Sequence, residues 1–410
     1  MTALPLPLPG SSTVGFNPAP YPDEPVALLQ LDASDPVEAA SAVYREIRRG
    51  RRVVAVAGGD PDAAARLTAA LDAVGVATSR PGPGEAVVGP GVTVVAGPAF
   101  LPDRPRPGPA RVLRVGLAGC GVVGGGVLSR LLGDPRFEVV GVLVRDSARP
   151  RDVVIPARLA LSDPAALLAR EPDILVEAIS DASTGLALIR AALARGVDVV
   201  SANKQAVGAD LPALVALAGA SGARLHYSAC VGGGAPLIET VRRARAHGAV
   251  VRIEAVLNGT CNFILNRLSE GLALDAALTA ARAAGFAEAD PSADLTGLDA
   301  GAKLAILGHE ARQGRLTAEV ARETLGPDVE LPQGRIRQLA RLDVRTGEVG
   351  VVLRAVDGDP LFADLPDEWN ALRVTTGDGR VFTARGRGAG RVPTTESVWA
   401  DLAELAADRP

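Results

Sequence analysis

The chain has 410 residues, of which 48% are hydrophobic, 22% charged and 3% aromatic, and its formal net charge is −4. This length predicts two to three domains with cores of Ala, Val and Leu. The weak negative charge and the few aromatics exclude a basic or base-stacking nucleic-acid surface. No apolar run reaches the about 18 residues of a membrane span, and the N-terminus lacks the basic residues of a signal peptide.

The first 110 residues predict a small α/β extension of unknown role. After a Pro- and Gly-rich start over 1–25, we expect strands and helices to alternate. The strands are expected at 25–31, 51–59 and 92–97, and the helices at 35–50 and 61–75. Five prolines over 97–111 then predict a stiff linker and a domain boundary.

From residue 111 the alternation of strands and helices becomes clearer. Strands are expected at 111–119, 137–144, 173–179 and 197–203. This pattern is typical of a parallel sheet with helices on both faces, so we expect a Rossmann-type α/β nucleotide-binding domain at 111–225. Beyond it, a strand at 250–259, the two strand patterns VGVVLRAV (349–356) and GRVFTAR (379–385) within about 350–385, and a last helix at 394–407 predict a second, α+β domain.

Three glycines directly after the first of these strands form a G-x-G-x-x-G motif. In a strand–turn–helix setting, the first glycine permits a tight turn, the second lets the backbone approach a pyrophosphate, and the third lets helix and strand pack closely. The pyrophosphate would sit at the helix N-terminus. A glycine-rich turn without a ligand is the alternative. The motif predicts cofactor binding at Gly119, Gly121, Val122, Val123 and Gly124.

The end of the second strand bears on the choice of cofactor. It ends in Val144, Arg145 and Asp146. An acidic residue there would bind the ribose hydroxyls of NAD, whereas an arginine would accept the 2′-phosphate of NADP. With Arg149 and Arg151 close by in the sequence, we expect Arg145 to bind NADP, and NAD stays open as the alternative.

Only two of the 43 lysine and arginine residues are lysines, Lys204 and Lys303. An ammonium is compact and can exchange a proton, whereas a guanidinium stays charged and needs a wide fork of partners. Lys204 follows the strand expected at 197–203, at the strand end where open α/β sheets bind ligands. Lys303 lies in the apolar run 298–308, four residues after Asp299. Because burying charge is costly, these lysines indicate a functional site. Surface lysines and an ion pair that only stabilises a helix are the alternatives.

A cluster of four carboxylates leads up to Lys303. Within 12 residues the chain has Glu288, Asp290, Asp294 and Asp299. One interpretation is a solvated acidic loop. The other is a pocket in which carboxylates facing the lysines bind an ammonium or an alcohol, and it makes Glu288, Asp294 and Asp299 candidate substrate ligands.

Over about 113–310, and again over 377–405, the chain resembles the homoserine dehydrogenase family. The resemblance rests on GCGVVGGG (119–126), SANK (201–204), VGGGAPLI (231–238), LNGTCNFIL (257–265), AGFAEADPSADLTGLDAGAKLAIL (284–307) and RGRGAGRVPTTESV (385–398). It implies reversible hydride transfer between NAD(P)H and L-aspartate 4-semialdehyde, giving L-homoserine, in threonine, methionine and isoleucine biosynthesis. It also implies a homodimer, with a substrate-binding and dimerisation domain at 226–376 and a return to the nucleotide-binding domain at 377–410.

The resemblance also implies roles for single residues. Lys303 would donate a proton to the aldehyde oxygen, and Lys204 would lie beside both nicotinamide and substrate. Glu288 and Asp299 would hold the amino and hydroxyl groups of the substrate. Two glycines would line the cofactor, Gly285 and Gly390. The three scattered cysteines of the chain agree with a cytoplasmic enzyme, because they predict reduced thiols rather than disulfides.

Two departures from the family pattern affect the expected site. Ser228 stands where the family has Glu, in a loop whose carbonyls bind a monovalent cation such as sodium. Val231, Gly233 and Ala235 could supply those carbonyls, but the missing carboxylate leaves the cation open. Ser180 lies in a segment that replaces the family's Gly-Gly turn, and we expect it to face the cofactor.

Two other functions stay open. One is an NAD(P)-dependent dehydrogenase of a related amino acid or semialdehyde. The other is a non-catalytic nucleotide-sensing protein with the same fold. The sensor is disfavoured, because it would not need both lysines in a chain that otherwise has none.

Overall fold

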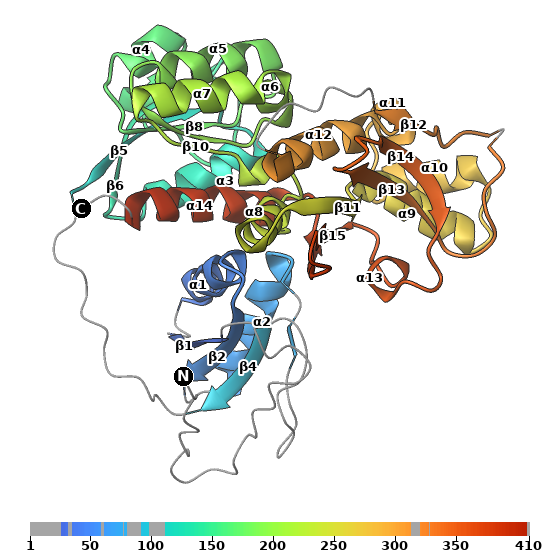
Figure 1. Ribbon diagram of the computed structural model, residues 1–410. Coiled ribbons are helices and arrows are strands. Elements are labelled where there is room, and N and C mark those ends of the chain that lie inside the picture. The colour runs from blue at the N-terminus through green and yellow to red at the C-terminus, as the bar shows by residue number, and fades with distance from the viewer. Residues whose placement is uncertain are drawn as a thin grey trace. The chain divides into compact units, whose positions relative to one another are not determined.

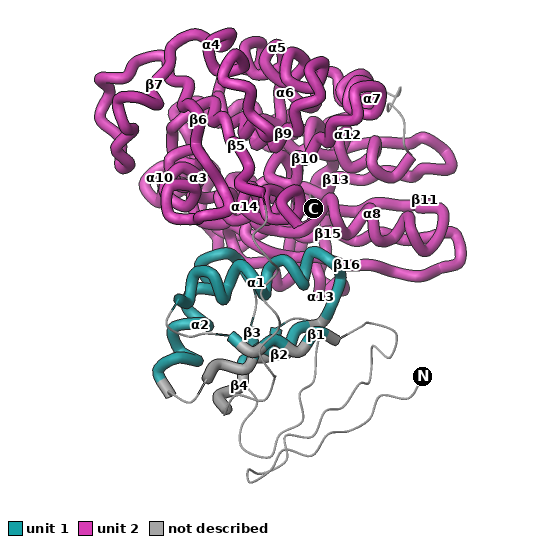
Figure 2. The backbone as a smooth tube through the Cα atoms, turned by 90° about the vertical axis from the view of Figure 1, so that its left-hand side faces the viewer, with its two compact units in different colours: residues 1–106 teal, residues 107–410 magenta. Residues whose placement is uncertain are grey.

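The structure is a computed structural model that describes residues 26–31, 35–58, 61–76, 78–79, 92–97, 111–312, 320–327 and 329–407. The chain forms two compact units, residues 1–106 and 107–410, which Figure 2 shows in two colours. The Pro-rich start over 1–25 and most of the linker expected at 97–111 lie outside the described residues.

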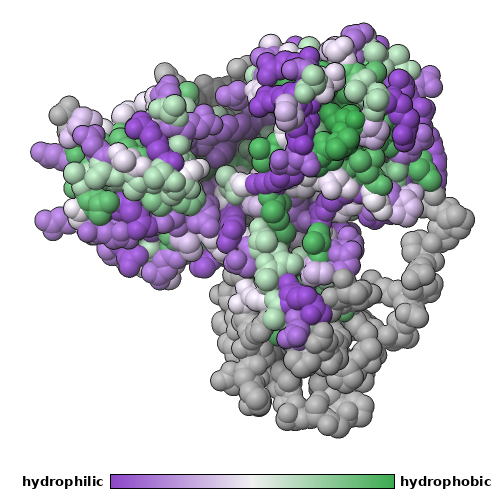
Figure 3. Space-filling view, turned by 180° about the vertical axis from the view of Figure 1, so that it is seen from behind, coloured by the Kyte–Doolittle hydropathy of each residue, from purple (hydrophilic) through white to green (hydrophobic). Residues whose placement is uncertain are grey.

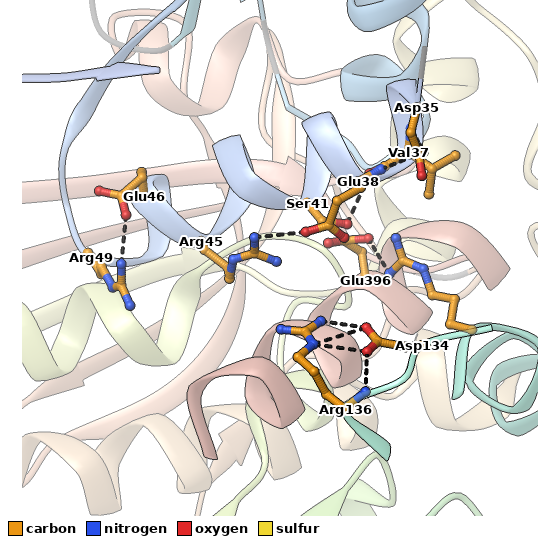
Figure 4. Close-up of polar contacts among 11 residues, drawn as sticks. Asp35, Val37, Glu38, Ser41, Arg45, Glu46, Arg49, Asp134, Arg136 and Glu396 are labelled. Carbon is orange, nitrogen blue, oxygen red and sulfur yellow. Dashed lines mark hydrogen bonds and ion pairs between the residues drawn. The ribbon is translucent and has the colours of Figure 1, made fainter. Parts of the chain in front are cut away.

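The first unit contains a four-stranded parallel sheet in the order β1-β2-β4-β3, with two helices. Its elements are β1 (Val26–Leu31), α1 (Pro36–Arg48), β2 (Arg52–Gly58), α2 (Pro61–Ala73), β3 (Thr78–Ser79) and β4 (Val92–Gly97). All expected elements are present, and β3 is an addition. Asp35 fixes the start of α1, because its carboxylate accepts hydrogen bonds from the backbone N–H groups of Val37 and Glu38 at 3.1 and 3.0 Å (Figure 4).

The second unit begins with a six-stranded, all-parallel sheet in the order β10-β9-β8-β5-β6-β7. Its strands are β5 (Leu113–Ala118), β6 (Phe137–Leu143), β7 (Ala160–Leu161), β8 (Ile174–Glu177), β9 (Asp198–Ser201) and β10 (Leu225–His226). The helices are α3 (Val122–Leu131), α4 (Pro164–Leu168), α5 (Ala182–Leu193), α6 (Lys204–Ala209) and α7 (Leu211–Ser221), with a 3-10 turn at Ala157–Leu159. The expected Rossmann-type α/β architecture is confirmed.

Helices cover both faces of this sheet, as Figure 1 shows, with α5 and α7 on one side and α3 and α14 (Arg391–Ala407) on the other. The last helix therefore returns to the nucleotide-binding sheet. Trp399 packs edge-on against Phe137 of β6, with 5.6 Å between the ring centres. Arg130 of α3 binds Glu396, which Figure 4 labels, at 2.7 Å. This helix begins at 391 rather than at the expected 394.

A second sheet of six strands, in the order β12-β14-β13-β11-β15-β16, follows. It is antiparallel except where β12 meets β14. The strands are β11 (Val250–Val256), β12 (Ala321–Arg322), β13 (Ile336–Asp343), β14 (Val349–Ala355), β15 (Trp369–Thr376) and β16 (Val381–Arg387). The helices are α8 (Leu237–His247), α9 (Gly259–Ser269), α10 (Leu274–Ala283), α11 (Ser292–Leu295), α12 (Leu298–Arg312) and α13 (Pro360–Ala363), and a 3-10 turn lies at Ser228–Cys230.

Two central strands of this sheet, β13 and β15, were not expected from the sequence. The segment of four carboxylates, for which an acidic loop was one interpretation, contains the one-turn helix α11. The three cysteines are free thiols, as expected, and all three are buried. Among the described helices, none has the length and apolar character needed to cross a bilayer. Figure 3 shows hydrophobic and hydrophilic residues interspersed over one face of the molecule, which is ordinary for a protein surface.

Candidate active site

The glycine loop after β5 has the geometry that its motif predicts. Gly119 has φ +91°, and a Cβ there would lie 2.4 Å from the carbonyl oxygen of Ala178. A Cβ on Gly124 would lie 2.1 Å from the carbonyl oxygen of Gly119, so this glycine brings α3 close to the strand. A Cβ on Gly121 would meet nothing within 4 Å, so the space in front of the α3 N-terminus is open. The loop therefore fits a bound pyrophosphate.

Both lysines meet on one carboxylate. Lys204 is the first residue of α6, and its ammonium forms an ion pair with Oδ1 of Asp299. Lys303, one turn after Asp299 on α12, lies 2.8 Å from Oδ2 and donates to the carbonyl oxygen of Leu257 at 2.7 Å. The side chains of Lys303 and Asp299 are only 12% and 7% exposed. The two lysines, about 100 residues apart in the sequence, thus form one charge cluster, in which Lys303 and Asp299 are buried and the Lys204 side chain is 34% exposed.

Burial alone would raise the pKa of the Asp299 carboxyl. The charges of Lys303 and Lys204 and their hydrogen bonds outweigh this effect and hold the pKa below its ordinary value. Asn258 adds a third donor, because its Nδ2 lies 2.9 Å from Asp299 and 2.6 Å from Asp294. Asp299 is therefore ionised at neutral pH, and Asp294 joins the cluster through Asn258.

A cavity of about 310 Å³ opens beside the lysines. It lies at the carboxyl ends of β8 and β9, where parallel sheets bind ligands. It is lined by Ile179, Ser180, Ala202, Asn203, Lys204, Gln205, Ala229, Cys230, Gly232, Gly233, Lys303, Gly388, Ala389 and Thr394. A larger cavity of about 390 Å³ lies along β6, but neither lysine and no residue of the glycine loop is among the described residues that line it. The smaller cavity is therefore the candidate active site.

The loop expected to hold a cation forms one wall of this cavity. Val231 and Ala235 are buried, and Gly233 has φ +56° with room for no side chain, since a Cβ would lie 2.7 Å from the carbonyl oxygen of Gly388. Ser228 donates its hydroxyl to Asp401 of α14 at 2.8 Å, and its backbone N–H donates to the same carboxylate at 3.2 Å. A buried carboxylate from α14 thus binds the loop at the position of Ser228.

Four of the expected site residues that are not among the described residues lining the cavity are Glu288, Gly285, Gly390 and Arg145. Glu288 and Gly285 are exposed in the segment between α10 and α11, and Gly285 has φ +78°. Gly390, with φ +115°, precedes α14 and lies two residues after the cavity-lining Gly388. Arg145 is exposed in the loop after β6. Among the described residues, neither Glu288 nor Arg145 forms an ion pair with Lys204 or Lys303.

Sequence reasoning missed Asn258, the link between Asp294 and Asp299. Its own side-chain oxygen accepts the backbone N–H of Cys261 at 2.8 Å and caps α9. An asparagine between a strand and a helix is an ordinary cap signal, so the cap itself could have been expected. The second role of Asn258 depends on a contact 41 residues away and has no local signal.

Comparison with known proteins places this geometry in a family. The model described as homoserine dehydrogenase matches residues 236–403, and the model of the homoserine dehydrogenase NAD binding domain matches residues 119–228. A homoserine dehydrogenase of Synechocystis sp. is 33% identical over 320 residues, which cover 72% of this chain and 73% of that protein. One of Corynebacterium glutamicum is 32% identical over 345 residues, which cover 78% and 76%.

Solved structures agree. The homoserine dehydrogenase of S. aureus is 26% identical with a TM-score of 0.63, and the match covers 73% of this chain and 79% of that one. A hyperthermophilic archaeal homoserine dehydrogenase in complex with NADPH has the same fold, with 24% identity, a TM-score of 0.64 and coverage of 73% and 98%. The chain therefore belongs to the homoserine dehydrogenase family of NAD(P)-dependent oxidoreductases.

Proposed function

We propose that this chain interconverts L-aspartate 4-semialdehyde and L-homoserine with Lys303 as the proton donor. The observation that carries the proposal is the meeting of both lysines on Asp299 beside a cavity at the strand ends. A bound nicotinamide would supply the hydride for reduction. As the aldehyde oxygen gains negative charge, it needs an acid close by, and such an acid contributes about 10²–10⁴-fold to the rate.

The environment of Lys303 suits this role. Its ammonium is held from two sides, by Asp299 and by the carbonyl oxygen of Leu257, so one N–H remains to point at a ligand in the cavity that Lys303 lines. Lys204 lines the same cavity and brings a second positive charge toward the developing alkoxide. Asp299 keeps both ammonium groups in place.

The substrate's amino and hydroxyl groups would be held by carboxylates. Asp299 and Asp294 are joined by Asn258 next to the lysines, which supports their role. Glu288 lies on the exposed segment before α11, and its assignment as a substrate ligand rests on the family resemblance.

For the cofactor we propose NADP, with NAD as the alternative. The open space at Gly121 fits a pyrophosphate, and Val122 and Val123 lie in the first turn of the helix that would receive it. Arg145 and Arg149 are exposed after β6, where a 2′-phosphate would lie. The archaeal relative that was solved with NADPH is consistent with this choice. Ser180, Gly285 and Gly390 are proposed to line the cofactor.

We also propose a cytoplasmic homodimer with a monovalent cation at the loop carbonyls of Val231, Gly233 and Ala235. The Asp401 carboxylate at Ser228 supports the cation, because it brings a negative charge to a loop that lacks the family's Glu. The three free, buried cysteines fit a reducing compartment.

Steady-state absorbance of reduced nicotinamide tests the proposal. L-Homoserine with NADP should give turnover, and NAD should give a lower kcat/KM. Turnover on other amino alcohols but not on homoserine would favour a related dehydrogenase. Cofactor binding without turnover on any of them would favour the sensor. A series in sodium, potassium and a large organic cation then tests the cation site.

A further inference from the structure

A buried carboxylate lies directly behind the candidate active site without lining it. Glu177, the last residue of β8, has 0% of its surface exposed. Its Oε2 accepts a hydrogen bond from the hydroxyl of Ser201 at 2.6 Å. Its Oε1 accepts one from the backbone N–H of Ile179 at 2.9 Å and one from Nδ2 of Asn203 at 3.2 Å. An acidic group is seldom buried this deeply unless its partners matter to the fold or to the site.

Two of these partners, Ile179 and Asn203, belong to the two turns that form the cavity wall, and Ser201 is the last residue of β9. Ile179 and Ser180 follow β8, and Ala202 to Gln205 follow β9; both segments line the cavity. Asn203 bridges them a second time, because its Nδ2 donates to the carbonyl oxygen of Ile179 at 2.9 Å. The hydroxyl of Ser201 also accepts the backbone N–H of Asn203 at 3.1 Å. One carboxylate thus ties the turn expected to face the nicotinamide to the turn that carries Lys204.

The same asparagine starts the helix of Lys204. Its Oδ1 accepts the backbone N–H of Ala206 at 3.0 Å and caps α6, whose first residue is Lys204. Two hydrogen bonds therefore fix the orientation of Asn203: its amide N–H donates to Glu177, and its oxygen accepts the backbone N–H of Ala206 in α6. A rotation of this side chain would release the cap and move the start of the helix.

Close packing holds the cluster in this arrangement. A Cβ on Gly185 of α5 would lie 2.6 Å from Nδ2 of Asn203 and 2.9 Å from Oε1 of Glu177. The backbone of α5 therefore approaches both groups so closely at Gly185 that no side chain fits between them. Burial raises the pKa of Glu177 most, and its hydrogen bonds with Ser201, Ile179 and Asn203 work against that increase.

We propose that Glu177 is a positioning residue for the reaction, which acts through Asn203 and Ser201 to fix Lys204 on Asp299 and the Ile179–Ser180 turn beside the nicotinamide. The inference rests on the proposed function. Glu177 is not among the described residues that line the cavity, so its effect is on where Lys204 lies.

The test is Glu177→Gln, with Ser201→Ala as a milder variant that removes one donor to Glu177. The glutamine keeps the shape and one acceptor oxygen, but its amide replaces an acceptor with a donor at Ser201. We expect kcat to fall by about tenfold or more, with cofactor affinity changed much less. The matched control is Asp198→Asn, because Asp198 is a 2% exposed carboxylate at the opposite end of β9 that binds Arg224 at 2.7 Å. It should lower the melting temperature and leave kcat unchanged.

A second readout does not depend on turnover. Because the chain has only two lysines, protein labelled with [¹³Cε]lysine gives two side-chain NMR signals, which Lys303→Arg assigns. Glu177→Gln and Ser201→Ala should shift or broaden the Lys204 signal more than that of Lys303, and Asp198→Asn should move neither.

Wild-type turnover on homoserine, measured in the same assay, separates this inference from the proposed function. A wild type without turnover would overturn the function, and the Lys204 signal would still report on positioning. If Glu177→Gln lowers the melting temperature as Asp198→Asn does, with kcat and the Lys204 signal unchanged, Glu177 is only structural and the inference is wrong.

Discussion

The chain contains two parallel sheets built by the same strand–helix alternation, and they differ in the residues at the ends of their strands. In the first unit, β2 ends at Gly58 and α2 begins at Pro61, much as β5 ends at Ala118 and α3 begins at Val122. At the ends of β5, β8 and β9, however, the second sheet places a positive-φ glycine, the Glu177 cluster and Lys204. Residues 1–110 contain no lysine, histidine or cysteine.

The difference shows that alternation predicts architecture and residue type predicts chemistry. Hydrophobic periodicity reports which side chains are buried, and both sheets satisfy it. A site needs groups that periodicity does not report, such as a compact ammonium in an apolar helix or a glycine where a Cβ would collide with a carbonyl. These groups are found in the second sheet and in α12, and changing them tests whether they set the two sheets apart.

The largest effect is expected from Lys303→Arg. The guanidinium is wider than the ammonium and cannot give up its proton, and the position is 12% exposed between Asp299 and the carbonyl oxygen of Leu257. Turnover should fall by at least about 10²-fold, with cofactor affinity from fluorescence titration nearly intact. The control is Arg312→Lys, an exposed change on the same helix, which should leave turnover and cofactor affinity unchanged. Activity within a few-fold of wild type would refute the assigned role.

The residue types that distinguish the two sheets could be recognised from the sequence, but the long-range contacts between them could not. The glycine loop and both lysines were found because each is a residue type that its position requires. The meeting of the lysines on Asp299 was anticipated in part, since Asp299 and Lys303 share a helix face. The ion pair between Lys204 and Asp299 spans 95 residues. No local sequence pattern indicates that two residues so far apart in the chain lie next to each other in the fold.

The sheet formed by β11 to β16 shows the same limit in the fold. β14 and β16 were expected, whereas their partners β13 and β15 were not, although β15 pairs with both β11 and β16. The strand β13 begins Ile-Arg-Gln, and Arg337 is buried there by donating to the carbonyl oxygens of Phe362 and Ala363 at 2.9 Å. A buried arginine breaks the apolar pattern of a central strand, and only a distant segment explains it.

A smaller effect, on stability, is expected from Glu310→Gln in α12. The carboxylate, 5% exposed, accepts the hydroxyl of Tyr227 and the guanidinium of Arg242 at 2.7 Å. Removing its charge leaves a half-buried arginine unpaired and should cost about 2–3 kcal/mol in chemical denaturation. Glu270→Gln, which breaks an exposed pair with Arg267, should cost about 0–1 kcal/mol. Equal losses in the two variants would contradict the role of burial.

The stability difference between wild type and Glu310→Gln should also depend on pH in a definite direction. Burial alone would raise the pKa of Glu310, but Arg242 and Tyr227 lower it below the ordinary value of a glutamate. A lowered pKa means that the stabilisation is complete above the unfolded value and is lost as the pH falls through the folded one. The stability gap between wild type and Glu310→Gln should therefore be full at pH 7 and shrink below about pH 4. A gap that widens in acid would contradict it.

A smaller effect still is expected from single glycines of the loop. Gly121→Ala should leave the melting temperature unchanged, because its Cβ meets nothing within 4 Å, yet it should weaken cofactor binding about tenfold by occupying the space of the pyrophosphate. Gly124→Ala should lower the melting temperature, since its Cβ would lie 2.1 Å from a carbonyl oxygen. Gly125→Ala, whose Cβ would be in ordinary contact at 3.9 Å, is the control. Unchanged cofactor affinity in Gly121→Ala would remove the loop from the site.

The smallest effect is expected from deleting residues 1–105. Each unit has its own sheet and buried side chains, from Val43 and Leu71 in the first to Leu117 and Leu304 in the second, so each meets the requirement for folding alone. Both lysines, Asp299 and all described residues that line the site cavity belong to the second unit. Its kcat and KM should then match those of the full chain, with deletion of 1–25 as the control. A soluble, folded but inactive product would show that the first unit contributes to the reaction although it has no lysine, histidine or cysteine, and that it does so by its effect on the second unit.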